Sequence, residues 1–142
     1  MSTSTIDALQ EEVIEEFSAF DDWMDKYQML IDLGNTLPPL DAKYKTESNL
    51  IEGCQSRVWL QCDLVEGRLV FSADSDALIT KGIIALLIRV ISNHTPDEIA
   101  HANLHFIDAI GLKDHLSPTR SNGLLSMVKQ IKAYAVGYAA RQ

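Results

Sequence analysis

The residues best suited to chemistry in this sequence are its two cysteines, Cys54 and Cys62. Cys54 follows Gly53, which lets the backbone turn sharply, and it stands just before a segment with strand periodicity. A thiol in a loop at the end of a strand is well placed for exchange, provided that its thiolate form is favoured. A single cysteine can equally be a small buried hydrophobic residue, so the residues alone leave both roles open for Cys54.

Cys62 stands in a different pattern, in phase with Val58 and Leu60 on the apolar side of a predicted strand. We therefore expect Cys62 to pack in the core. Zinc and iron–sulfur sites use three or four cysteine or histidine ligands at close spacings, and this sequence has no such spacing. The pattern predicts a chain without a metal site.

The histidines offer a second kind of chemistry. His101 and His105 are four residues apart, but the glutamate of a zinc-protease motif is missing and Asn103 interrupts the helix pattern, so we expect both near the surface. His115 could lie near Cys54 in space. A cysteine-dependent hydrolase that uses Cys54 and His115 thus stays open as an alternative, although no local signature supports it.

Charged residues near these positions could support a thiolate or contact a partner. Arg57, Lys81 and Arg120 are the candidate cations, because a positive neighbour favours the thiolate. Asp74 and Asp76 precede an apolar helix, and we expect them first to cap it through its unsatisfied N–H groups. The same two carboxylates are candidates for contacts with a partner protein.

Composition limits the classes of protein that fit. The chain has 142 residues, of which 46% are hydrophobic and 23% charged, as expected for one folded domain over residues 1–142. Its net charge of −8 disfavours nucleic acid and anionic membrane surfaces as partners. The longest apolar stretch, residues 77–91, is too short for a membrane span, and no secretory signal is visible, so we expect a cytoplasmic protein with free thiols.

The elements that must position these residues follow from hydrophobic periodicity, and they predict an α+β domain with helices packed on one face of a small antiparallel sheet. The sheet is expected to hold a hairpin and a short third strand near residues 49–52. Before the sheet we predict a helix from Ile6 capped by Ser4, a second helix capped by Asp21 or Asp22 and ended by Gly34, and an extended connection over 35–49. The hairpin is predicted over 58–64 and 68–72, around Glu66-Gly67. After it we predict a core helix within 77–91, a short helix capped by Thr95 in a segment closed by Gly111, and a last helix from Pro118.

Three segments of this chain resemble the SufE family of sulfur acceptors, which includes the CsdE branch. The first reads Gly-Cys-Gln-Ser-Arg-Val-Trp over residues 53–59, and the Leu-Pro-Pro-Leu of residues 37–40 also resembles the family's segment before the cysteine loop. The other two cover residues 74–82 and 115–123. The resemblance runs from about Trp23 to Ala133.

The resemblance implies a fold shared with iron–sulfur scaffold proteins of the IscU type. It implies that Cys54 accepts persulfide sulfur from a pyridoxal-phosphate cysteine desulfurase of the SufS or CsdA type, enhances that enzyme, and passes the sulfur to an iron–sulfur scaffold such as the SufBCD complex. The chain itself would carry no cofactor. A non-covalent desulfurase activator is a further alternative. The residues expected to support Cys54 or to face the partner are Gly53, Gln55, Ser56, Arg57, Asp74, Asp76 and Arg120.

Overall fold

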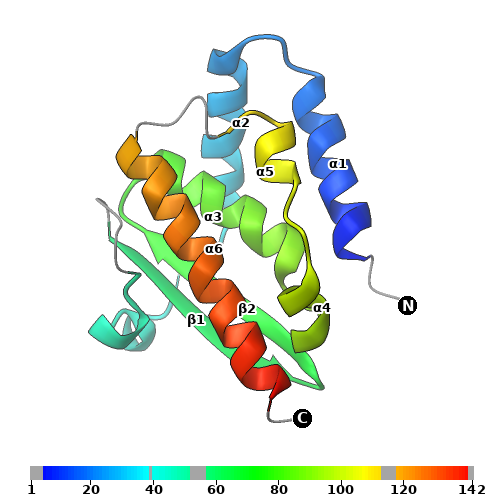
Figure 1. Ribbon diagram of the computed structural model, residues 1–142. Coiled ribbons are helices and arrows are strands. Elements are labelled where there is room, and N and C mark those ends of the chain that lie inside the picture. Colours follow the sequence, from blue (N-terminus) through cyan, green and yellow to red (C-terminus); the bar gives the residue numbers. More distant parts are fainter. Residues whose placement is uncertain (1–4, 39, 52–56, 113–117, 141–142) are drawn as a thin grey trace.

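The computed structural model describes residues 5–38, 40–51, 57–112 and 118–140, and residues 118–121 by their backbone alone. The fold is α+β, as predicted. Helix α3 runs through the middle of the molecule, with α1 and α2 on one side and with a β-hairpin and α6 on the other (Figure 1). The elements are α1 (Ile6–Ser18), α2 (Trp23–Thr36), the short 3-10 turns η1 (Ala42–Tyr44) and η2 (Glu47–Asn49), β1 (Val58–Val65), β2 (Arg68–Ser75), α3 (Leu78–Ile91), α4 (Pro96–His101), α5 (Phe106–Ala109) and α6 (Pro118–Ala139).

The hairpin is antiparallel, and its two-residue turn is the one that the sequence predicts. Glu66 and Gly67 both have positive φ, 51° and 81°, which suits the tight turns that join twisted strands. The second strand runs to Ser75, three residues beyond the predicted end at Ser72. In the described part of the chain, the predicted third strand is reduced to a single antiparallel bridge between Leu50 and Trp59.

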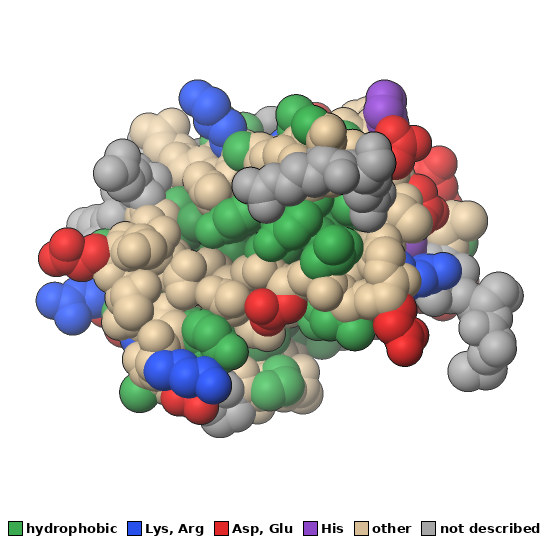
Figure 2. All heavy atoms as spheres, turned by 90° about the horizontal axis from the view of Figure 1, so that it is seen from below, with side chains coloured by type: hydrophobic (Ala, Val, Ile, Leu, Met, Phe, Trp, Pro, Cys, Tyr) green, Lys and Arg blue, Asp and Glu red, His purple; other side chains and the backbone are tan. Residues whose placement is uncertain are grey.

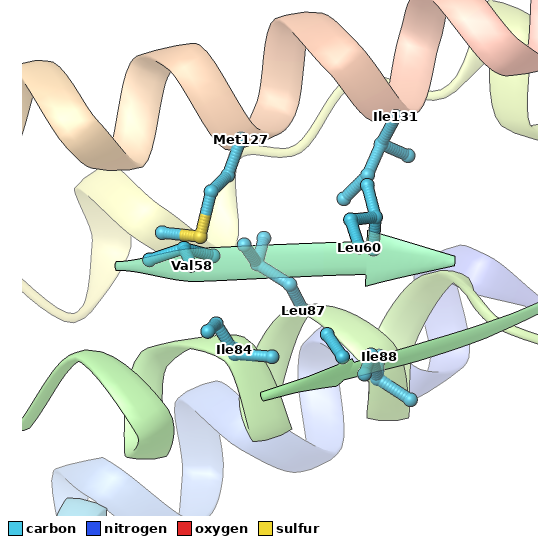
Figure 3. A pocket seen from close by; sticks show the side chains of 8 residues that line it. Val58, Leu60, Ile84, Leu87, Ile88, Met127 and Ile131 are labelled. Carbon is cyan, nitrogen blue, oxygen red and sulfur yellow. The ribbon is translucent and has the colours of Figure 1, made fainter. Parts of the chain in front are cut away.

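One face of the hairpin is covered by α3 and α6. The alternating strand pattern directs apolar side chains of both strands toward these helices, where they are buried. Figure 3 shows Met127 and Ile131 of α6 together with Ile84, Leu87 and Ile88 of α3 around Val58 and Leu60, where they line an apolar cavity of only about 10 Å³. This helix-on-sheet core is therefore well filled. The buried strand residues are Val58, Leu60, Cys62, Leu69, Phe71 and Ala73.

Side-chain caps explain where several helices begin. Asp22 accepts a hydrogen bond from the Met24 amide at 2.9 Å and caps α2, as predicted. Thr95 and Glu98 form the predicted capping box at the start of α4. Helix α1 is capped by Thr5, whose hydroxyl accepts from Ala8, and the predicted cap Ser4 lies outside the described residues.

Helices α2 and α3 cross at two glycines, which sets how closely they pack. A Cβ atom added to Gly82 would lie 2.1 Å from the carbonyl oxygen of Leu30, and one added to Gly34 would lie 2.9 Å from the Gly82 nitrogen. The prediction that Gly34 ends α2 is wrong, because the helix continues to Thr36. Gly34 is needed for the close approach of α3. Gly111, with φ of 75°, does follow the short helix α5, as predicted.

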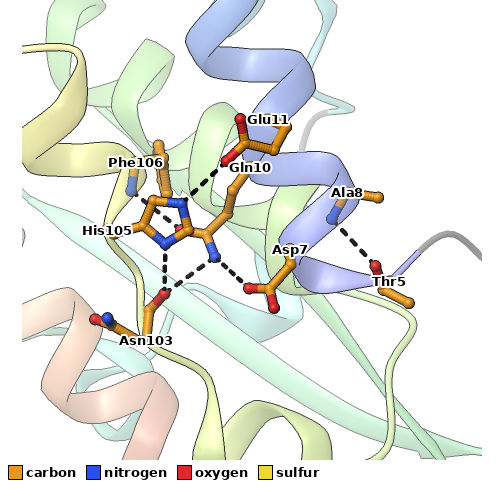
Figure 4. Close-up of polar contacts among 8 residues, drawn as sticks. All are labelled: Thr5, Asp7, Ala8, Gln10, Glu11, Asn103, His105 and Phe106. Carbon is orange, nitrogen blue, oxygen red and sulfur yellow. Dashed lines mark hydrogen bonds and ion pairs between the residues drawn. The ribbon is translucent and has the colours of Figure 1, made fainter.

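A buried glutamine attaches α1 to the connection between α4 and α5 (Figure 4). The Gln10 side-chain amide donates to the Asn103 carbonyl at 3.0 Å and to Asp7 at 3.2 Å. Its oxygen accepts from the Phe106 amide at 3.1 Å. The side chain of Gln10 is completely buried, so these contacts hold α1 through a fully satisfied polar group.

The molecular surface at the end of the hairpin is partly hydrophobic. Figure 2 shows a band of apolar side chains on the face where the hairpin and the C-terminal half of α6 come together. Leu64 and Val65 at the end of β1 are 44% and 50% exposed, and Val136 of α6 is 58% exposed. Within the described ranges, no helix has the length and the apolar character that a bilayer-spanning segment requires.

Candidate functional site

The predicted cysteine loop is held together at its base. Gly53, Cys54, Gln55 and Ser56 lie outside the described residues, but the chain on either side of them is placed. The Ile51 amide donates to the Val58 carbonyl at 2.8 Å, next to the bridge between Leu50 and Trp59. The two chain ends that flank residues 52–56 are therefore held side by side.

Arg57 and Asp76 form a second contact at the base of the loop. The Arg57 amide donates to the Asp76 carboxylate at 3.1 Å, and the Asp76 amide donates to the Arg57 carbonyl at 3.3 Å. The prediction that Asp74 and Asp76 cap α3 is wrong, since Ala77 is the N-cap residue and makes no side-chain cap. The Asp76 carboxylate instead holds the first residue after the loop.

Asp74 is buried and joins two lysines from different elements. Its carboxylate pairs with Lys45 at 3.2 Å and with Lys81 of α3 at 3.6 Å, and it accepts from the Ser75 amide at 2.8 Å. Burial acts to raise the pKa of Asp74, but the hydrogen bonds from Ser75 and Lys45 and the charges of Lys81 and Lys45 outweigh it and lower the pKa. Asp74 therefore stays ionised and fixes the segment before the cysteine loop.

Lys45 was missed by the sequence reasoning. It also lies over the Trp59 ring, with its amine 5.4 Å from the ring centroid. It is 29 positions away from Asp74 in the sequence, and no spacing rule links two residues so far apart in different elements. Lys45 and Asp74 come together only in the folded structure.

The three candidate cations have different surroundings. Lys81 is paired with Asp74. The side chain of Arg120, in the first turns of α6, lies outside what the structure describes. Arg57 is exposed, and its guanidinium forms no ion pair within the described part of the chain. Of the three, Arg57 is therefore the described cation whose charge is available beside the loop.

Cys62 is a core residue, as predicted. Its side chain is 8% exposed, and burial, with a smaller contribution from Asp63, raises the pKa of its thiol to about 12. At neutral pH the thiolate fraction of such a group is on the order of one in 10⁵. Cys62 is therefore a packing residue and a very poor nucleophile.

His101 and His105 lie near the surface, as predicted, and do not form a site together. Helix α4 ends at His101, so His105 is not on the same helix. His101 contacts Asp97 at 3.3 Å and His105 contacts Glu11 at 3.4 Å. Among the described residues, no group of three or more histidine, cysteine or carboxylate side chains is placed to hold a metal ion. His115 lies outside the described residues.

These features define a class of protein: an α+β domain whose helix-covered hairpin carries a cysteine loop closed at its base by Ile51, Arg57 and Asp76. The chain belongs to the SufE family. The family model described as "Fe-S metabolism associated domain" matches residues 11–135.

Several curated relatives support this assignment. The chain is 39% identical over 127 residues to SufE-like protein 1 of Arabidopsis thaliana, described as chloroplastic/mitochondrial, which covers 89% of this chain but only 34% of that protein. The chain thus spans about a third of the length of that relative. SufE-like proteins of Rhizobium meliloti and Synechocystis are 36% and 32% identical, with 89% and 100% of this chain and 94% and 89% of those proteins covered.

A solved structure has the same fold. The solution structure of a hypothetical protein from Thermus thermophilus superimposes with a TM-score of 0.77, covering 93% of this chain and 96% of that one. The sequence identity is only 18%, so this similarity concerns the fold alone.

Proposed function

We propose that this protein is a sulfur carrier that accepts persulfide sulfur on Cys54 from a pyridoxal-phosphate cysteine desulfurase. The observation that carries the proposal is membership of the SufE family, whose description is iron–sulfur metabolism. A carrier of this kind needs one accessible thiol. The sequence contains two cysteines, and the burial of Cys62 leaves Cys54 as the residue for that role.

The proposed step is thiol exchange at sulfur. The Cys54 thiolate attacks the terminal sulfur of the desulfurase persulfide, the bond between the two persulfide sulfurs breaks, and the desulfurase cysteine leaves as a thiolate. Sulfur moves as a neutral atom between two thiols, so no external oxidant or reductant is required. Pyridoxal phosphate belongs to the partner enzyme and only generates the persulfide there.

The described surroundings of the loop support a carrier that exposes Cys54 on docking. Ile51 and Val58, on either side of the loop, are buried, and Leu50 next to them is 37% exposed, so apolar surface lies at the loop base. A persulfide must be kept from water and reductants between donor and acceptor, and we infer that Cys54 rests against this surface until the desulfurase binds. Alkylation of Cys54 by iodoacetamide should then be faster with the desulfurase present, and equal rates would contradict the inference.

The next acceptor is proposed to be an iron–sulfur scaffold, such as a complex of the SufBCD type. We propose a SufS- or CsdA-type desulfurase as the donor, with enhancement of its turnover because Cys54 removes the product sulfur. A cytoplasmic location fits the free thiol of Cys62, the free thiol expected at Cys54 and the acidic composition of the chain. These assignments rest on the family and on the chemistry of the loop together.

Mass spectrometry tests the proposal. The protein is mixed with cysteine and a SufS-type or CsdA-type desulfurase, and the peptide that contains Cys54 is examined for one added sulfur atom. Cys54→Ser should abolish this adduct and the enhancement of the desulfurase, whereas Cys62→Ala should keep both. Enhancement that survives Cys54→Ser would indicate a non-covalent activator. Turnover of an ester or amide without a desulfurase would indicate the hydrolase.

A further inference from the structure

The outer edge of β2 is only partly covered. In a hairpin with a two-residue turn, Val65 and Arg68 at the turn exchange hydrogen bonds, and every second pair along the ladder does the same. The residues between these pairs direct their backbone N–H and C=O groups away from β1. In β2 the residues that face outward in this way are Leu69, Phe71, Ala73 and Ser75.

The segment that follows α3 covers the first part of this edge. The Leu69 amide donates to the His94 carbonyl at 2.8 Å, and the Phe71 amide donates to the Ser92 hydroxyl at 3.0 Å. Within the described part of the chain, the Phe71 carbonyl and both backbone groups of Ala73 have no hydrogen-bond partner. Ala73 is only 2% exposed, and backbone groups buried to this extent are nearly always paired in folded proteins. The edge therefore holds a short run of main-chain groups that a ligand can pair.

A crevice of about 460 Å³ lies beside these unpaired groups. Strand β2 and Ile88 of α3 form one wall, and the connection after α2 forms the other. Leu37, Leu40 and Tyr44 make this second wall largely apolar. The volume is in the range of sites that hold a ligand. The unpaired groups of the edge therefore face an apolar space that is large enough to be occupied.

The chemistry of the walls restricts what fits. Pro38 in the second wall has no N–H to donate to the edge. Among the described residues that line the crevice, only Asp41 is charged, and its carboxylate accepts from the Lys43 amide at 3.1 Å at the start of η1. The occupant must therefore bring main-chain donors and acceptors of its own, together with apolar side chains. An extended peptide does so, since the N–H and C=O groups along one of its edges repeat every two residues, as they do in β2.

We propose that this crevice is a docking site for an extended apolar segment of a partner protein, which adds to the sheet as a strand beside β2. A second copy of this chain does not fit, because the same edge in that copy is recessed behind its own connection and the two edges do not reach each other. A single extended segment has no such cover and enters the crevice from the solvent. The proposal depends on the backbone of β2 and not on the sulfur chemistry of Cys54.

Binding of a model peptide to the whole protein tests the proposal. The probe is Lys-Val-Thr-Val-Thr-Val-Lys, acetylated and amidated at its ends, because β-branched residues favour the extended form and lysines keep the peptide dissolved. Nitrogen-15 NMR titration should give saturable shifts at the amides of residues 71–73 and 40–44, and the Ala73 amide should exchange with solvent more slowly in the complex. No saturable shifts there at millimolar peptide would overturn the proposal and would leave the assignment of Cys54 untouched.

Two N-methylated versions of the probe separate strand pairing from simple apolar contact. One carries N-methyl groups on its valines and the other on its threonines, so each version blocks one edge of the extended peptide. A strand beside β2 presents only one edge to it. One version should therefore bind like the parent peptide and the other at least about tenfold more weakly, because two amide hydrogen bonds, each worth about fivefold in affinity, are lost. Equal affinities of the two versions would overturn the proposal.

A pair of proline variants locates the peptide on one edge of the hairpin. Ala73→Pro removes the outward N–H without removing a bond to β1, since proline is tolerated where the N–H of an edge strand faces out, and it should weaken binding at least about fivefold. Leu64→Pro is the matched control, because Leu64 faces outward on the opposite edge, and it should bind like wild type. Weaker binding by Leu64→Pro alone would place the peptide on the wrong edge and refute the proposal. If circular dichroism shows that Ala73→Pro does not fold, the N-methylated peptides decide the question with wild type alone.

Self-association through the same edge is checked without peptide. Sedimentation velocity should give the same association state for wild type and Ala73→Pro at every protein concentration. If wild type instead dimerises as its concentration rises and Ala73→Pro does not, the edge is an interface between copies of this chain and the proposed partner segment is wrong.

Discussion

Residues 6–36 and residues 37–142 differ sharply in charge. The first region, which contains α1 and α2, has nine acidic residues and one basic residue, Lys26, and so carries a net charge of −8. The second has eleven acidic and eleven basic residues and is neutral. The entire net charge of the chain therefore lies on these two helices and the short connection between them.

The candidate site belongs to the neutral region. The described partners of Arg57, Asp74 and Asp76 all come from residues 45–81, and none comes from α1 or α2. An excess of negative charge keeps a protein soluble, but it repels anions and shifts the pKa values of nearby ionisable groups. This arrangement separates that charge from the loop in which a thiolate must form.

Three of the contacts that hold the two regions together can each be changed separately. They are the crossing of α2 and α3 at Gly34 and Gly82, the buried side chain of Gln10, and the ion pairs of Arg89 with Glu16 and Glu12. The predictions that follow test how strongly each contact joins the acidic helices to the neutral region.

The largest effect is expected from Gly82→Ala. Because the new Cβ would lie 2.1 Å from the Leu30 carbonyl oxygen, α2 and α3 must move apart, and we expect a loss of about 3 kcal/mol or more in the free energy of unfolding. Urea denaturation followed by circular dichroism measures it. Gly137→Ala is the matched control, because Gly137 is in α6 with open space around it, and this change should stabilise by about 0.5–1 kcal/mol. Equal effects of the two changes would show that the crossing tolerates separation.

The second contact is tested by Gln10→Leu, which should cost about 2 kcal/mol. Leucine fills the space but leaves the Phe106 amide without its buried acceptor, and the Asn103 carbonyl loses one of its donors while keeping the His105 amide. The same denaturation experiment measures this loss. Gln28→Leu provides the control, since the Gln28 side chain is exposed and, among the described residues, bonds only to Asp32 on the same helix, so a change within about 0.5 kcal/mol is expected. A similar loss in both variants would mean that α1 is not anchored by Gln10.

Much of the neutral region could be predicted from local sequence signals. The turn at Glu66-Gly67, the capping box from Thr95 to Glu98 and the alternation that buries Cys62 all depend on residues close together in the chain, and the structure confirms each. Gly34 was misread because glycine is common after helix ends, whereas its role here depends on Gly82, 48 positions later. Contacts between residues so far apart in the chain leave no periodic pattern in the sequence.

The same limit applies to the site. The sequence resemblance identified the segments around Cys54, Asp74 and Asp76, but helix capping was the wrong physical role for the two carboxylates. Asp76 bonds to Arg57 and Asp74 to Lys45 because the hairpin register brings residues from before and after the loop side by side. A capping rule considers only one helix end, so it could not include these partners.

A smaller effect, of about 1 kcal/mol, is expected when Asp74 is changed to Asn. The lowered pKa of Asp74 means that its ionised form stabilises the fold above its unfolded-state pKa of about 3.9, and that this contribution is lost as pH falls through the lower folded-state pKa. Wild type should therefore lose stability more steeply than Asp74→Asn below about pH 4, as measured by urea denaturation at several pH values. Glu16 and Glu98 also have lowered pKa values, so part of the decrease in the free energy of unfolding with falling pH remains in both proteins. Asp32→Asn, which changes an exposed carboxylate, should follow wild type, and parallel curves for Asp74→Asn would contradict the assigned role.

The smallest effect is expected from Arg89→Met, which removes the one ionic link described here between α3 and the acidic face of α1. The hydrogen bond from Arg89 lowers the pKa of Glu16, and the guanidinium also lies 3.9 Å from Glu12. Because these side chains are partly exposed, we expect a loss of only about 0.5–1 kcal/mol at low salt, and almost none in about 1 M salt, where the Debye length is about 3 Å. Arg57→Met removes an arginine without an ion pair in the described structure and should show no such salt dependence. If Arg89→Met costs as much in high salt as in low salt, its aliphatic stem and not its charge joins the acidic helix to the neutral region.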